Sequence, residues 1–189
     1  MQLSKKECRA LFSDKRKEIT PNQLRLASEA ISTILFTHFN LQDKTVSIFL
    51  PIERRKELNT YIILEQAINL DAKVGIPKAN FDTNEMKHFL YEGPEQLELS
   101  EHAIPEPKYG KSLSNQKFDF IIVPLLAFDK KGYRVGYGKG FYDQFLAKCS
   151  SNCQFIGLSL FDPIDTITDV HEADIKLHHC ITPNGKFSF

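Results

Sequence analysis

The amino-terminal part of the chain places polar and apolar side chains at the spacing of amphipathic helices. Ser4 followed by Glu7 is a capping box, and Thr20 followed by Gln23 repeats it, with a proline at the first helical position. After each cap, apolar residues recur every three or four positions, as they do on one face of a helix. The pattern therefore predicts two amphipathic helices, and the second is expected to pack on a sheet.

Short apolar runs that stop at prolines predict strands. The strongest run is 118–123, which is rich in aromatic and β-branched residues and is closed by Pro124. A weaker run, 74–77, is likewise expected to end at its proline. Residues 93–117 are rich in Pro, Glu, Ser and Lys, which predicts irregular surface structure. Further strands are predicted at 45–50, 87–91 and 154–160.

Further helices are expected between these strands. A third helix is predicted from about Asn59 or Thr60 through Leu70, and a fourth follows Gly140. Strands that alternate with helices indicate an α/β fold. Residues 1–189 are therefore predicted to form a single domain, built as an open, mainly parallel sheet flanked by helices on both faces.

Composition narrows the class of protein. Hydrophobic residues make up 42% and charged residues 25%, which are ordinary values for a globular protein. The 24 basic residues balance the 24 acidic ones, so broad binding to nucleic acid or to an anionic membrane is not expected. No apolar run approaches the roughly 20 residues that a membrane helix needs. We expect a monomer with neither a nucleic-acid nor a membrane partner.

Cysteine usage and the first residues indicate the compartment. None of the four cysteines belongs to a C-x-x-C pair, and a chain of this size does not need a disulfide framework. Cys149 and Cys153 are expected as core thiols on one face of the fourth helix. The segment 1–6 lacks the apolar core of a signal peptide. These features predict a cytoplasmic protein with reduced thiols.

The segment 134–143, with the sequence RVGYGKGFYD, is the main candidate for chemistry. Its three alternate glycines permit positive φ angles and leave backbone N–H groups open to an anion. The helix that follows directs its amino-terminal N–H groups to the same space. Arg134 and Lys139 add positive charge. The segment predicts a cradle for a polyphosphate, and a plain turn is the alternative that the pattern leaves open.

The details of this segment exclude two common nucleotide motifs and suggest a metal ion. Lys139 is followed by Gly140 rather than Ser or Thr, so the loop is not a Walker A motif, and Phe141 replaces the third glycine of a dinucleotide fingerprint. Asp143 closes the loop. A carboxylate beside phosphates suits Mg²⁺, whereas a first-turn Asp favoured by the helix dipole is the equal alternative.

The segments Val123–Asp129 and Gly132–Asp143 together resemble the signature of the 5-formyltetrahydrofolate cyclo-ligase family, also called 5,10-methenyltetrahydrofolate synthetases. That signature is close to V-P-x-x-A-F-D, a short gap, and R-x-G-x-G-x-G-Y-Y-D. Segments 5–9, 49–52 and 173–176 agree in order and spacing, so the resemblance covers nearly the whole chain. It implies ATP-dependent cyclisation of 5-formyltetrahydrofolate to 5,10-methenyltetrahydrofolate, with release of ADP and phosphate, through a phosphorylated formyl oxygen.

The resemblance also implies roles for individual residues. Magnesium ligands would be Asp143 and Asp174, and the catalytic residues would be Lys139, Arg134 and Tyr142. Contacts to folate are implied for Leu50, Glu57, Tyr137, Gly138, Lys139, Gly140 and Phe141. Contacts to ATP are implied for Lys5, Arg9, Arg134, Val135, Gly136, Tyr137, Gly138, Lys139, Gly140, Phe141 and Tyr142.

The chain departs from the common family pattern in two places. The segment Glu53–Lys56 is about two residues longer than usual, which leaves Glu57 and Glu53 as alternatives for the folate contact. A glutamate suits that role because it can accept hydrogen bonds from the amino and ring N–H groups of a pterin. Phe141 replaces the first tyrosine of the usual Tyr-Tyr-Asp ending, so it keeps a ring for stacking and loses a hydroxyl.

Several assignments remain open at this point. Arg16 shares a helical stripe with Lys5 and Arg9 but is expected at the surface. The alternative metal ligands are Asp129, Asp162 and Asp169. Two other functions compete with the cyclo-ligase: a catalytically silent nucleotide- or folate-binding module, and a sugar-phosphate isomerase or transferase on a related sheet, which would need no ATP.

Overall fold

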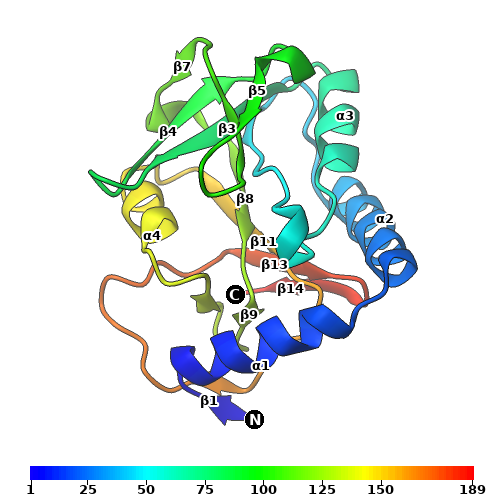
Figure 1. The fold of residues 1–189 in the computed structure, drawn as a ribbon, viewed down its shortest axis with the longest axis vertical. Coiled ribbons are helices and arrows are strands. Elements are labelled where there is room, and N and C mark those ends of the chain that lie inside the picture. Colours follow the sequence, from blue (N-terminus) through cyan, green and yellow to red (C-terminus); the bar gives the residue numbers. More distant parts are fainter.

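An eight-stranded sheet forms the middle of the molecule in the computed structural model, which describes residues 1–189 (Figure 1). Its spatial order is β14-β13-β11-β8-β2-β3-β4-β7. The strands from β13 to β3 run parallel, and β14, β4 and β7 join the edges antiparallel. The predicted open, mainly parallel α/β sheet is confirmed. The strands are β2 (Thr45–Ser47), β3 (Lys73–Asn80), β4 (Glu85–Leu90), β7 (Ser112–Leu113), β8 (Phe120–Pro124), β11 (Gln154–Leu158), β13 (His179–Thr182) and β14 (Gly185–Ser188).

Four helices pack around this sheet: α1 (Lys5–Glu18), α2 (Pro21–His38), α3 (Tyr61–Asn69) and α4 (Phe141–Leu146). Both predicted capping boxes are present, at Ser4 and Thr20. Helices α2 and α3 cover one face and α4 the other (Figure 1). Along β8, Ile122 packs with the α2–α3 side, whereas Ile121 and Val123 pack with the α4 side. Burial on both faces explains why this strand is a continuous apolar run.

Short paired strands complete the fold. β1 (Gln2–Leu3) pairs with β12 (Thr166–Ile167), β5 (Leu97–Leu99) with β6 (Pro105–Pro107), and β9 (Ala127–Phe128) with β10 (Arg134–Val135). Helix α1 packs on the β9–β10 hairpin through Cys8 and Phe12. Short 3-10 turns lie at Glu53–Arg55, Pro94–Gln96 and Asn115–Lys117.

The expectation that β3 ends at Pro77 was wrong, because the strand continues to Asn80. Its partner β2 pairs only with Lys73–Gly75, so Pro77 has a single neighbouring strand, β4. The N–H of Ala79, two residues on, points away from β4 to the Glu106 side chain. Proline is tolerated where its missing N–H would face away from the paired strand.

The expectation of irregular structure at 93–117 was also wrong. This segment contains the β5–β6 hairpin and strand β7, and two of its polar residues are buried. Gln96 bonds to the carbonyls of Leu90 and Tyr109 at 2.9 and 2.6 Å. Glu106 accepts the Ala79 N–H at 2.9 Å. Hydrogen bonds of buried polar side chains stabilise this region. The spacing of apolar residues therefore does not indicate that the region is ordered.

Helix α4 is shorter than expected. It ends at Leu146, so Cys149 and Cys153 do not share a helix face, and Cys153 instead precedes β11. Both still pack in or against the apolar cluster on the α4 side, as core thiols. None of the helices combines the length and apolar character needed to cross a bilayer.

Candidate functional site

A cavity of about 600 Å³ opens beside the carboxyl ends of β2 and β8. The chain leaves β2 through α3 toward β3 on one side, and leaves β8 through α4 toward β11 on the other. The two central strands therefore form the point at which the sheet connections diverge. Ligands of open α/β sheets bind in the crevice at such a point.

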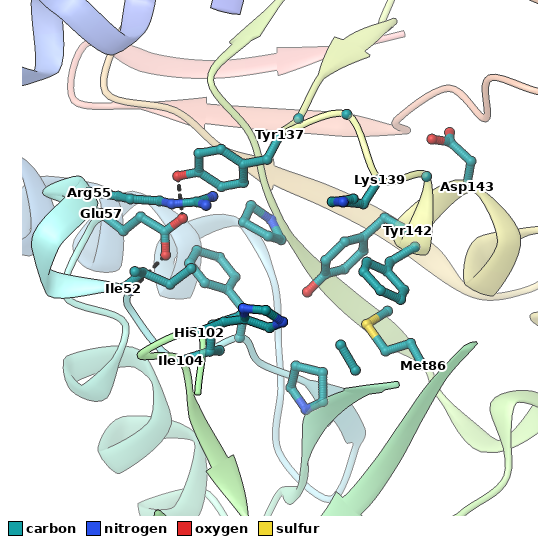
Figure 2. A pocket seen from close by; sticks show the side chains of 18 of the residues that line it. Ile52, Arg55, Glu57, Met86, His102, Ile104, Tyr137, Lys139, Tyr142 and Asp143 are labelled. Carbon is teal, nitrogen blue, oxygen red and sulfur yellow. Dashed lines mark hydrogen bonds between the residues drawn. The ribbon is translucent and has the colours of Figure 1, made fainter. Parts of the chain in front are cut away.

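The predicted site residues are distributed over four parts of the chain, and all of them line this one cavity. Neither Glu53 nor the alternative metal ligands Asp129, Asp162 and Asp169 line it. We call the part around the 134–143 backbone, Lys139, Asp143, Lys5 and Asp174 the loop end. We call the part around Leu50, Ile52, Glu57 and the side chains of Tyr137 and Phe141 the Glu57 end. Figure 2 shows Asp143 and Glu57 on opposite sides of the cavity.

The 136–140 loop leaves a row of donors unused. Gly138 and Gly140 have φ angles of 94° and 72°, which non-glycine residues rarely adopt. None of the backbone N–H groups from 136 to 140 donates a hydrogen bond to another protein group. Successive free N–H groups in a glycine-rich turn form an anion-binding concavity. Helix α4 has only 6 residues, so the loop amides contribute more to this concavity than the helix dipole does.

Two side chains near the loop also lack protein partners. Lys139 forms no ion pair or hydrogen bond, and its ammonium group points into the cavity (Figure 2). The Tyr142 hydroxyl is buried without a hydrogen-bond partner. Burial raises the pKa of Tyr142, so the hydroxyl stays protonated and remains a donor. A buried unpaired donor is costly, so a ligand group that accepts from it would gain affinity.

Arg134 is held rigidly at the loop end. It is buried and donates to Asp143 Oδ1 at 2.9 Å and to the Ile175 carbonyl. Asp143 Oδ1 also accepts the Ile175 N–H at 3.0 Å, while its Oδ2 has no hydrogen-bond partner. Burial lowers the pKa of Arg134, although the neighbouring carboxylates oppose this shift. The pair thus presents one free carboxylate oxygen to the cavity.

Asp174 is paired with Lys5 across the same end. The Lys5 ammonium lies 2.6 and 2.5 Å from the two Asp174 oxygens, and the His171 N–H donates to Oδ2 at 2.6 Å. Burial acts to raise the pKa of Asp174, but His171 and Lys5 outweigh it and hold the pKa below its usual value. Asp174 is therefore an anion at neutral pH.

The three alternative metal ligands are committed elsewhere. Asp129 is fully buried and accepts backbone N–H groups from Lys131, Tyr133 and Ile167. Asp169 accepts the first N–H of α1 at 2.6 Å. Asp162 accepts from Thr182 and Asn184. No group of three or more His, Cys, Asp or Glu side chains is placed to hold a metal. A cation bound by Asp143 and Asp174 would therefore need further ligands from outside the protein.

At the opposite end, Glu57 is buried and already hydrogen-bonded. Its Oε2 accepts the Ile52 N–H at 2.8 Å, and its Oε1 accepts the Tyr137 hydroxyl. Burial raises the pKa of Glu57, while these two donors oppose the shift. Glu53 lies on the exposed 3-10 turn outside the cavity. Of the two open alternatives, the geometry favours Glu57.

Arg16 is not at the surface, and that expectation was wrong. Its side chain is buried, with Nη1 donating to the Tyr137 hydroxyl at 3.0 Å and Nη2 to the Leu125 carbonyl at 2.6 Å. Arg9 donates through Nε to the Gly136 carbonyl at 3.0 Å. The helical stripe that joins Arg16 to Lys5 and Arg9 was the signal available in the sequence. Arg9 and Arg16 both contact the loop, at Gly136 and Tyr137, while Lys5 contacts Asp174.

Sequence reasoning missed the wall opposite the loop. It comes from the tip of the β3–β4 hairpin and from the β5–β6 hairpin. Phe81 and His102 lie with ring centroids 4.0 Å apart, and Phe81 contacts Phe141 edge to face at 5.1 Å. This aromatic group and Met86 give the cavity an apolar side, on which Figure 2 labels His102 and Met86. Nothing in the local pattern identifies these residues, because they meet only through the fold.

Comparisons with known proteins identify the family of this chain. The sequence profile of the 5-formyltetrahydrofolate cyclo-ligase family matches residues 1–183. The Escherichia coli K12 5-formyltetrahydrofolate cyclo-ligase is 28% identical over 179 residues, covering 92% of this chain and 97% of that protein. The Mus musculus 5-formyltetrahydrofolate cyclo-ligase is 28% identical over 186 residues, covering 92% and 91%.

Solved structures give the same result. An NMR structure of Aquifex aeolicus 5,10-methenyltetrahydrofolate synthetase superposes with a TM-score of 0.77 at 25% identity, covering 97% of this chain and 92% of that one. A Mycoplasma pneumoniae 5,10-methenyltetrahydrofolate synthetase superposes with a TM-score of 0.74 at 20% identity, covering 96% and 99%, and supports the fold.

Proposed function

The chain belongs to the 5-formyltetrahydrofolate cyclo-ligase family, and from this premise we propose that it uses ATP to convert 5-formyltetrahydrofolate to 5,10-methenyltetrahydrofolate, with release of ADP and phosphate. The observation that carries the proposal is the pairing of two environments in one cavity. One end offers a row of free N–H groups and an unpaired lysine. The other offers an apolar wall and a buried carboxylate.

The proposed reaction has two steps. The formyl oxygen attacks the γ-phosphorus of ATP, so an O–P bond forms, the bond to the β-phosphate oxygen breaks, and ADP leaves. Nitrogen 10 of the folate then attacks the activated formyl carbon, loses its proton, and expels phosphate. Phosphorylation is useful because an amide oxygen is a poor leaving group and phosphate is a good one. The protein's task is positioning and stabilisation of charge.

The loop end suits the phosphate part of this reaction. The N–H groups from 136 to 140 would hold phosphate oxygens, as they have no protein acceptor. Lys139 is free to move with the transferred group, and Arg134 is fixed by Asp143 in the wall behind it. The Tyr142 hydroxyl, which lacks a partner, is suited to donate to an oxygen of the substrate.

Magnesium fits the same end. Asp143 Oδ2 has no protein partner, and Asp174 is an anion on the same cavity, so these two residues would hold Mg²⁺ together with phosphate oxygens. When bound, the ion would neutralise phosphate charge. Lys5 is paired with Asp174 at this end and would lie close to the bound phosphates.

The Glu57 end suits the folate. Leu50 is buried in the wall, and the aromatic group of Phe81, His102 and Phe141 offers flat surfaces to a ring system. Glu57 keeps lone pairs beyond those used by Ile52 and Tyr137, so it can accept from the amino and ring N–H groups of a pterin. The residues 137–141 lie between the two ends, so a folate at one end and ATP at the other would bring the formyl group close to the γ-phosphate.

One assay tests this function directly. Purified protein is mixed with 5-formyltetrahydrofolate, ATP and Mg²⁺, and the absorbance of the methenyl product is followed together with ADP release. We expect product and ADP in equal amounts, and none when ATP is omitted or replaced by a non-hydrolysable analogue. Product without ATP would rule out the phosphorylated intermediate. Tight binding of folate without any turnover would support a silent binding module instead.

A further inference from the structure

The glycine loop needs anchors from outside itself. Gly138 and Gly140 adopt positive φ angles, and Gly136 and Gly140 have open space where a side chain would be. Such residues have the largest conformational freedom to lose, and no loop N–H bonds to the protein. The Gly136 carbonyl accepts from Arg9 Nε at 3.0 Å, and the remaining contacts that hold Tyr137 come from its own side chain.

The Tyr137 side chain has such contacts in three directions. Its hydroxyl accepts from Arg16 Nη1 at 3.0 Å and donates to Glu57 Oε1. The Arg55 guanidinium lies 3.9 Å from the centre of its ring, and Figure 2 shows the two side chains next to each other. A guanidinium stacked on an aromatic face is attractive. Tyr137 is thus enclosed by α1 on one side and by the 53–57 segment on the other.

The two elements that enclose Tyr137, helix α1 and the 53–57 segment, are themselves held in place by hydrogen bonds. Arg16 is buried, and its second amino group donates to the Leu125 carbonyl at 2.6 Å. Lys56 has a left-handed backbone and donates to the carbonyls of Lys17 and Ile19, at the end of α1. Arg54 donates to the His102 carbonyl at 2.6 Å. The segment that is longer than the family pattern is therefore tied both to α1 and to the β5–β6 hairpin.

We propose that Arg16 is a positioning residue that acts on the substrate through Tyr137: it holds the Tyr137 hydroxyl against Glu57 and so fixes the carboxylate that receives the folate. Arg55 stacks on the ring of the same tyrosine. This rests on the proposed function, because Glu57 receives folate only in that reaction. Arg16 itself does not line the cavity, so it has no direct route to a ligand.

Kinetics of matched variants test the proposal. Tyr137→Phe keeps the ring and removes the hydroxyl, and Arg16→Lys keeps the charge but cannot reach both acceptors. Each is expected to raise KM for 5-formyltetrahydrofolate about tenfold, the loss typical of one hydrogen bond to a charged group, while KM for ATP changes less than about twofold. The double variant should be no worse than about twice Tyr137→Phe, because both changes break one chain of contacts.

The opposite results overturn the proposal. If the two changes multiply to about a hundredfold, Arg16 does not act through Tyr137. If Arg16→Lys lowers only the melting temperature and leaves KM unchanged, its role is structural. Arg25→Lys alters an exposed arginine paired with Glu29 on α2 and is the matched control, with no expected change.

Hydrogen exchange keeps the test independent of turnover. The Ile52 amide donates to Glu57 Oε2 at 2.8 Å, so it should exchange faster in Arg16→Lys and Tyr137→Phe than in the unaltered protein, whereas amides of α2 should not change. Unchanged exchange at Ile52 would overturn the proposal even if activity falls. If the unaltered protein has no cyclo-ligase activity but exchange at Ile52 responds, the proposed function fails and the anchoring role stands.

Discussion

The two ends of the cavity differ in how far the protein satisfies its own polar groups. At the loop end, the backbone N–H groups from 136 to 140, the Lys139 ammonium and Asp143 Oδ2 lack protein partners. At the Glu57 end, both carboxylate oxygens and the Tyr137 hydroxyl are already hydrogen-bonded. The loop end therefore depends on a charged ligand to complete it, whereas the Glu57 end is shaped before the ligand arrives.

This difference teaches what each end contributes to catalysis. Donors without a protein partner can form contacts with the reacting phosphate that are stronger in the transition state than in the ground state. Such groups affect kcat. Groups that are preorganised lower the cost of ordering the substrate, so they affect binding. Substitutions at the two ends should consequently have different kinetic signatures.

The largest effect is expected from Lys139→Ala. The variant removes the one unpaired side-chain cation of the 134–143 segment, so kcat should fall by at least a hundredfold, as for loss of a group that stabilises the transition state. Steady-state kinetics with varied ATP measure it. Lys148→Ala, an exposed lysine beyond α4, is the control. A rise in KM for folate with unchanged kcat would contradict this prediction and would show that Lys139 acts at the Glu57 end.

A smaller effect is expected from Glu57→Gln. The amide keeps the shape but loses the charge and one acceptor, so KM for 5-formyltetrahydrofolate should rise about tenfold to thirtyfold, with little change in kcat or in KM for ATP. Glu53→Gln on the exposed 3-10 turn is the control that decides between the two alternatives in the sequence. An equal effect of both variants would contradict the assignment.

A smaller effect still is expected from Asp143→Asn. Loss of the negative charge should raise the magnesium concentration for half-maximal turnover by about tenfold, because one carboxylate ligand is replaced by a neutral oxygen. A magnesium titration at saturating ATP measures this, and circular dichroism checks that the variant remains folded. Glu172→Gln, an exposed carboxylate close in sequence to Asp174, is the control. An unchanged titration would remove Asp143 from the ligand set.

The least effect on turnover is expected from substitution of His88, which lies outside both ends of the cavity. This residue is expected to affect how the free energy of unfolding depends on pH. His88 is buried, accepts or donates to Ser47 Oγ at 2.8 Å, and burial lowers its pKa to about 3. Its folded pKa lies below its unfolded value of about 6.5, so stability is retained above pH 6.5 and lost as pH falls toward 3, by up to about 1.4 kcal/mol per pH unit.

His88→Gln removes this titration and keeps a side chain able to bond to Ser47. The unfolding free energy of the variant, measured in urea at pH 7, 6 and 5, should fall less steeply with decreasing pH than that of the unaltered protein. His38→Gln, an exposed histidine at the end of α2, should leave the slope unchanged. Equal slopes for all three proteins would show that His88 is protonated in both states or in neither.

Local signals predicted much of this molecule. The capping boxes at Ser4 and Thr20 and the buried run of β8 depend on neighbours in sequence, so their patterns could be interpreted directly. The 134–143 segment combined alternate glycines, two basic residues and a closing aspartate. All of its residues line the cavity. Asp129 shows the limit: it was a candidate metal ligand, yet its carboxylate bonds to backbone N–H groups that only the folded β9–β10 hairpin brings together.

What could not be predicted depends on contacts between distant segments. Arg16 lies buried because it meets Leu125 and Tyr137, more than 100 positions away in the sequence. The aromatic wall forms because the β3–β4 and β5–β6 hairpins converge over α4. The strand β3 was wrongly predicted to end at Pro77. The sequence does not show that, at this position, β3 is paired with a neighbouring strand on one side only.

The ion pairs Lys5–Asp174 and Arg134–Asp143 affect how the rate of ligand association depends on salt concentration. Each pair cancels its own charge within 3 Å, so the long-range field of the cavity comes from the lining cations that have no carboxylate partner: Arg9, Arg54, Arg55 and Lys139. A polyphosphate ligand would be attracted by these four cations and not by the two ion pairs. Its rate of association should consequently fall as the salt concentration rises.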